Sequence, residues 1–81
     1  MDQEKLDHMR SVLNKLEDIK NSQESIIDKI NHVITDLFQH PDKKLEKVME
    51  DAHQKSSDNV DGVREALEDY EMRINKIENE N

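Results

Sequence analysis

The stretch INHVITDLFQHPDKKLEKVM, residues 30–49, decides the fold of this 81-residue chain. Apolar residues recur at helical spacing on both sides of Pro41, the only proline in the sequence. A proline inside a helix removes an amide donor and clashes with the carbonyl four residues earlier, which costs about 3 kcal/mol or more. It also biases the preceding residue, His40, away from helical geometry, whereas at the first position of a helix it costs little. We therefore expect one helix to end and a second helix to begin at Pro41.

Pro41 also stands at the midpoint of the chain, so the two arms are of equal length. If the chain folds back there, residue i of the first arm pairs with roughly residue 82 − i of the second, over arms about 55 Å long at 1.5 Å per residue. We predict one domain, residues 1–81, with a helix at about 2–39, a turn at about 40–42 and a helix at about 42–78. Asp42 would lie in the first turn of the second helix, where its charge suits the helix dipole.

The first arm carries three apolar series that each repeat every seven residues. No glycine or proline interrupts residues 1–40, and nearly every apolar step is three or four residues, which is typical of one helix face. The series are Val12, Ile19, Ile26 and Val33; Met9, Leu16, Gln23, Ile30 and Leu37; and Leu6, Leu13, Lys20, Ile27 and Ile34. Lys20 and Gln23 are polar interruptions, which can fix helix register. For Lys20 we favour the simpler interpretation that its ammonium group reaches past the apolar edge to water.

The second arm is less regular, because the segment QKSSDNVDG at residues 54–62 contains few apolar residues. The segment contains Gly62, the only glycine, and good N-cap residues at 57–59, so a loop between two shorter helices is one interpretation. The apolar phase is nevertheless preserved, because Met49 and Val60 are eleven residues, or three helical turns, apart. We favour one continuous helix, with a break at 57–62 as the alternative. A hairpin places this weak stretch opposite the polar interruption of the first arm.

The width of the apolar stripe indicates more than one neighbouring helix. Three positions in seven are apolar, whereas a two-stranded coiled coil needs only two. We therefore expect an all-α fold, a long antiparallel, coiled-coil-like helical hairpin that pairs into a four-helix bundle. The candidate partner-binding residues are those at the edge that a single hairpin would leave exposed. They are Val12, Ile19, Ile26, Val33 and Phe38. For Phe38 and Tyr70, the only aromatic residues, packing in the core is the favoured role.

Composition excludes several classes of partner. The net charge is −8, and both halves are acidic: residues 1–40 hold eight acids and five bases, and residues 41–81 hold twelve acids and seven bases. Such a surface repels the phosphates of nucleic acids and anionic membranes, so we expect neither as a partner. No apolar run approaches the roughly 20 residues that span a bilayer, and the charged segment 1–5 predicts no signal peptide. The absence of cysteine rules out disulfides and is compatible with a cytoplasmic location.

The sequence offers little catalytic or metal-binding chemistry. Histidine and carboxylate residues have i,i+4 spacing at Glu4/His8 and Asp28/His32, but acids are so frequent here that such pairs arise by chance. The sequence has no phosphate-binding glycine loop, no cysteine nucleophile and no serine in a glycine-flanked turn. We therefore expect no enzymatic activity, no cofactor, no metal and no small-molecule substrate. The acid-first i,i+4 pairs Asp51/Lys55 and Asp69/Arg73 are expected to support the second helix.

Two functions agree with these features. The first is a non-catalytic protein–protein interaction module, in which the acidic hairpin forms a homodimer, binds a partner helix, or does both through its apolar stripe. The alternative is a small cytosolic chaperone or inhibitor, for example one associated with secretion, that captures a helical client protein.

Overall fold

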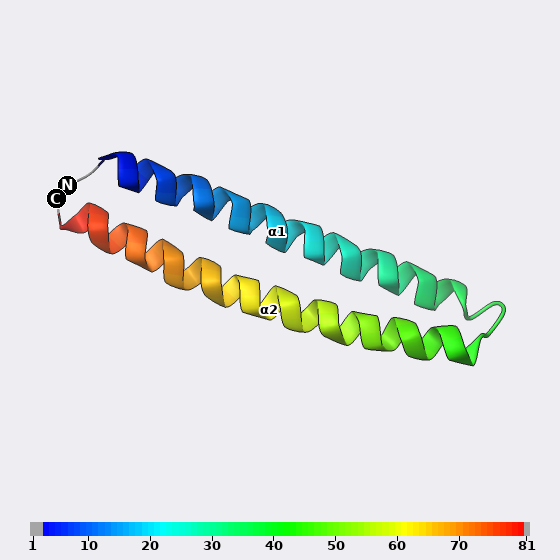
Figure 1. Cartoon of the computed structure of the whole chain (residues 1–81). Coiled ribbons are helices and arrows are strands. Elements are labelled where there is room, and N and C mark those ends of the chain that lie inside the picture. Colours follow the sequence, from blue (N-terminus) through cyan, green and yellow to red (C-terminus); the bar gives the residue numbers. More distant parts are fainter. Residues whose placement is uncertain (1–2, 81) are drawn as a thin grey trace.

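The computed structural model describes residues 3–80 and consists of two long antiparallel helices (Figure 1). Helix α1 runs over Gln3–Asp36 and helix α2 over Lys43–Asn79. The chain reverses direction between them, and the beginning of α1 lies beside the end of α2 (Figure 1). The Cα atoms extend over 60 × 15 × 13 Å. The all-α helical hairpin predicted from the central proline is therefore confirmed.

Regular α-helical geometry ends shortly before Pro41. The amide of Leu37 still donates to the carbonyl of Val33 at 3.1 Å, as in an α-helix. The next two amides donate only three residues back, from Phe38 to Thr35 at 3.1 Å and from Gln39 to Asp36 at 3.3 Å. Residues 37–40 thus form a tightened turn, and α1 ends at Asp36 rather than at about 39. Tightening of the last turn is a common way to end a helix, and the ring of Pro41 disfavours helical geometry just beyond it.

Asp42 is the N-cap of α2. Its backbone is extended, with φ −136° and ψ 99°, and its side chain accepts a hydrogen bond from the amide of Leu45 at 3.0 Å. The second helix begins one residue later than the predicted start at about 42, and Asp42, which we expected inside the first turn, is the cap. The reason is that a short carboxylate at the cap satisfies an amide that the helix itself leaves unpaired. From Lys43 onward α2 is continuous to Asn79, so residues 57–62 are helical.

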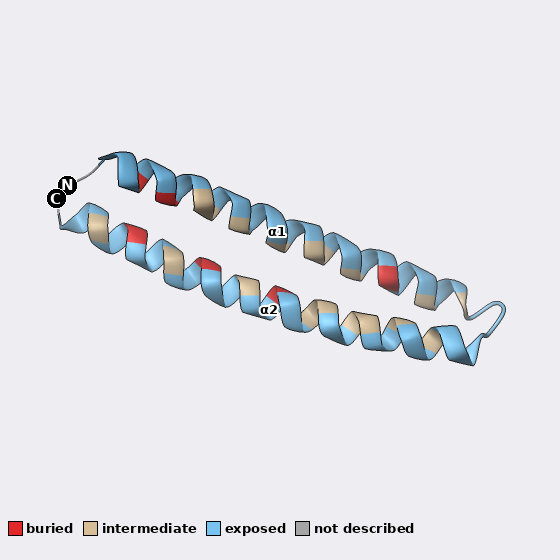
Figure 2. Ribbon diagram, in the orientation of Figure 1, coloured by how far each residue is buried: buried red, intermediate tan, exposed pale blue. Residues whose placement is uncertain are grey.

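The buried residues of each helix face the other helix (Figure 2). They are Leu6, Met9 and Ile30 on α1 and Val60, Leu67 and Ile74 on α2. The main cluster lies at the end of the hairpin away from the turn, where Leu13, Tyr70 and Ile77 pack against Leu6, Met9 and Ile74. The predicted core role of Tyr70 is confirmed.

The helices meet in one regular register. The cluster brings Leu6, Met9 and Leu13 of α1 against Tyr70, Ile74 and Ile77 of α2, so that the numbers of facing residues sum to about 83. Seven-residue steps in opposite directions continue this register along the hairpin. They place Lys20 opposite Val63 and Gln23 opposite Val60. The polar interruption of α1 therefore faces the weak stretch of α2, as the hairpin predicts.

Surface ion pairs support α2. Lys55 Nζ lies 2.9 Å from Asp51 Oδ2, and Arg73 Nε lies 3.1 Å from Asp69 Oδ2. The hydrogen bond to Asp51 and its negative charge raise the pKa of Lys55 above the ordinary 10.5. Both acid-first pairs predicted from the sequence are confirmed, and pairs of this kind add a few tenths of a kcal/mol each to a helix.

Candidate protein-interaction surface

A row of β-branched side chains lies along α1 beside the buried seam. Ile19, Ile26 and Val33 keep 45%, 47% and 36% of their surface exposed, and Val12 is half-buried. The row is open because α2 covers only the other two apolar series of α1, those of Leu6 and Met9. The structure thus leaves four of the five predicted partner-binding residues together on one line of the surface.

The matching positions of α2 lie on the same side of the seam. The seam is the line of core positions at which the two helices meet. Each residue of the α1 row directly precedes a seam residue in the sequence. In an antiparallel helix pair, the residues at this position on the two helices lie next to each other. On α2 they are Leu45, Ala52, Asn59, Ala66 and Arg73. We call Val12, Ile19, Ile26 and Val33 of α1, with Leu45, Ala52 and Ala66 of α2, the apolar flank.

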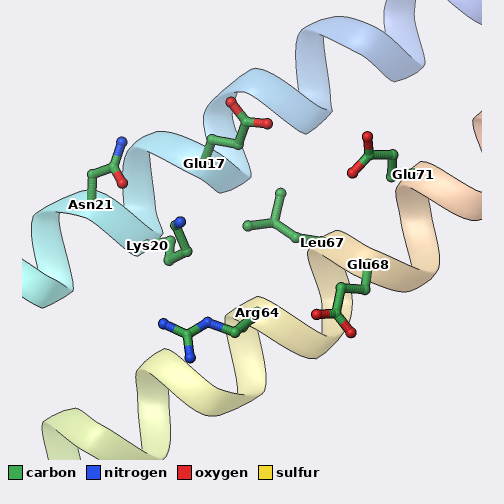
Figure 3. A pocket seen from close by; sticks show the side chains of 7 residues that line it. All are labelled: Glu17, Lys20, Asn21, Arg64, Leu67, Glu68 and Glu71. Carbon is green, nitrogen blue, oxygen red and sulfur yellow. The ribbon is translucent and has the colours of Figure 1, made fainter.

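The other side of the seam is charged. Arg10 and Glu78, which each directly follow a seam residue, form an ion pair between the two helices there. Further along is a shallow groove of about 350 Å³ (Figure 3). It is lined by Glu17, Lys20, Asn21, Arg64, Leu67, Glu68 and Glu71. In Figure 3, Leu67 points between the helices and charged side chains from both helices surround it. The two sides of the hairpin therefore differ sharply in polarity.

Phe38 does not continue the α1 row. It lies in the turn after α1 and keeps 75% of its surface exposed. The predicted core role of Phe38 is therefore wrong, because α1 ends before it and α2 has no residue that covers it. Phe38 remains a separate apolar side chain at the turn end of the hairpin.

The sequence pattern did not distinguish some exposed apolar residues of α2 from the residues of its core. Leu45 and Val48 fit the helical spacing of the core but are exposed, as is Met72. Spacings of three and four residues occur between neighbouring faces of a helix as well as within one face. Spacing alone therefore did not separate the buried residues of α2 from the exposed apolar residues beside them. Leu45 and Val48 extend the apolar surface toward the turn. Met72 lies on the outer surface of α2.

The described residues gather no group of metal-binding side chains. Within residues 3–80, no three residues among His, Asp and Glu lie close enough together to hold a metal ion. In the same range, neither helix has an apolar segment that is long enough to cross a membrane.

Comparisons of the chain with protein-family models, with curated proteins and with solved structures found no match.

Proposed function

We propose that the chain is a non-catalytic protein–protein interaction module, an acidic helical hairpin that associates with itself or with a partner helix through the apolar flank. The observation that carries this proposal is the row of Ile19, Ile26 and Val33, which retain 36–47% of their surface in the single hairpin. Four aligned β-branched side chains on one side of a charged hairpin are typical of a surface that another helix covers.

The surface area of the hairpin supports the proposal. The described chain exposes 6299 Å² at a mass of 9.6 kDa. A compact monomer of this mass exposes about 5,100 Å². The hairpin is elongated and two helices thick, so it exposes about 1,200 Å² more than a compact monomer. Burial of the half-exposed row by another helix would contribute about 1 kcal/mol for each side chain.

The test is the replacement of Ile26 by aspartate, at the middle of the row. A buried carboxylate opposes association strongly, while the hairpin itself tolerates a charge at a half-exposed position. We expect wild-type protein at micromolar concentration to sediment at twice the chain mass, about 19 kDa, and Ile26→Asp to sediment at 9.6 kDa. The matched control is Met72→Asp on the outer surface of α2, which should leave the wild-type mass unchanged.

A dimer that tolerates Ile26→Asp would contradict the proposed surface. A wild-type mass of 9.6 kDa, together with binding of an apolar dye, would instead favour a small chaperone or inhibitor that captures a helical client. In that case the apolar flank would be open in the free protein, and Ile26→Asp would reduce the dye signal.

A further inference from the structure

We infer that the occupant of the apolar flank is a second copy of this chain, related to the first by a two-fold axis parallel to the long axis of the hairpin. In this arrangement α1 of each copy packs against α2 of the other, and every pair of adjacent helices is antiparallel. The inference rests on the proposed function and adds the partner and its geometry.

The shapes of the two helices along the flank are complementary. On α1 the row consists of isoleucine and valine, whereas the middle of the α2 side carries Ala52, Asn59 and Ala66. Gly62, three residues after Asn59 and four before Ala66, lies on the same side of α2. A Cβ atom at Gly62 would meet nothing within 4 Å, so the single hairpin gives no steric reason for a glycine. Rotation about the long axis brings large residues of each copy against small residues of the other.

The heights of the residues along the hairpin agree with this packing. Rotation about the long axis leaves every residue at its own height, so residue i of α1 faces the region of residue 83 − i in the other copy. Ile19 then lies at the height of residue 64, between the partner's Gly62 and the partner's Ala66. Close approach of two helices is easiest at such small residues, and the exposed side chain of Ile19 meets them there.

The charges at the border of the flank favour the same axis. Lys15 follows Val12 by three residues and forms no ion pair within residues 3–80. In the proposed dimer it lies at the height of residue 68, near the partner's Asp69, whose carboxylate is also contacted by Arg73 of its own helix. An axis perpendicular to the hairpin would instead pack α1 against α1 and place Lys15 opposite Lys29. Like charges so placed oppose association, whereas opposite charges direct it.

The available area is sufficient for a stable dimer. A face 60 Å long and 15 Å wide offers on the order of 900 Å², and a standard specific interface buries about 800 Å² on each partner. The flank runs along this face over most of its length, from Val12 to the turn. A second copy has the matching length and covers the flank from end to end.

The experiment uses single-cysteine variants, because the natural chain has no cysteine. Ile19→Cys and Gly62→Cys are purified separately, mixed, and treated with a short bifunctional maleimide. We expect a crosslinked product of about 19 kDa in the mixture and little product from either variant alone, because α1 and α1 lie on a diagonal of the bundle. Met72→Cys, outside the interface, is the control and should not crosslink with either variant.

Efficient crosslinking of Ile19→Cys with itself would overturn the inference in favour of the perpendicular axis. A wild-type chain that stays at 9.6 kDa at all concentrations would also overturn it, while binding of another protein through Ile26 would leave the proposed function intact. Conversely, a dimer that is insensitive to Ile26→Asp would contradict the proposed function itself.

A charge reversal provides a second readout that does not need the cysteine variants. We expect Lys15→Glu to weaken dimerisation about threefold and the further change Asp69→Lys in the same chain to restore it, as for exposed ion pairs. Circular dichroism should show equal helix content for the three proteins. A loss with Lys15→Glu that Asp69→Lys does not restore would count against the proposed axis.

Discussion

At the scale of single residues, the reversal of the chain depends on two neighbours with different tasks. Pro41 disfavours helical geometry at His40, just after the tightened turn that ends α1. Asp42 begins α2, because its carboxylate accepts the Leu45 amide at 3.0 Å and its carbonyl accepts the Glu46 amide at 2.9 Å. The proline excludes a continuous helix, and the aspartate determines where the second helix begins.

We predict that Asp42→Ala lowers the free energy of unfolding by about 1 kcal/mol, because the Leu45 amide loses its capping partner. Urea unfolding followed by circular dichroism measures the change at a fixed protein concentration. Asp42→Ser is the matched control and should retain most of the stability, since serine is an equally good N-cap. Equal losses in the two variants would show that the cap does not stabilise α2.

At the scale of the two helices, the middle of the seam is its weakest part. Gln23 faces Val60, and its side-chain oxygen is buried without a hydrogen-bond partner in the described structure. Lys20, one turn earlier, directs its ammonium to Glu24 at 3.6 Å. The nearest charged partner of the Lys20 ammonium is thus a carboxylate of its own helix. The polar layer thus lowers the stability of the hairpin at mid-length.

We predict that Gln23→Leu raises the free energy of unfolding by about 1 kcal/mol, since it removes an unsatisfied polar group and adds apolar contact with Val60. Thermal or urea unfolding measures this change. Asn21→Leu, at an exposed position of the same turn, is the control and should change stability by less than about 0.5 kcal/mol. A loss of stability in Gln23→Leu would mean that Gln23 has a partner that the single hairpin lacks.

The sequence predicted the elements better than it predicted the surface. The seven-residue repeats of α1 and the central Pro41 were sufficient to predict two antiparallel helices. They also nearly predicted which residues of the two helices face each other. Which apolar residues remain exposed depends on how far α2 covers α1, and a helical period does not contain that information. Leu45 and Val48 fitted the core period yet lie outside, and Phe38 is exposed because α1 ends before it.

At the scale of the whole molecule, the polarity of the hairpin is divided between two sides of one seam. The charged side carries the Arg10–Glu78 ion pair and the groove around Leu67. The apolar flank carries the exposed row of Ile19, Ile26 and Val33. This division is the physical basis of the proposed interaction, because association covers the apolar side and leaves the charged side in water.

The most direct test of this account is small-angle X-ray scattering of the wild-type protein, which reports mass and radius of gyration together. We predict a mass of about 19 kDa, twice that of the chain. The radius of gyration should rise only from 18.3 Å to about 19 Å, because helices that pack side by side lie about 10 Å apart. A mass of 9.6 kDa at every concentration, or the far larger radius of an end-to-end dimer or an unbent helix about 120 Å long, would contradict it.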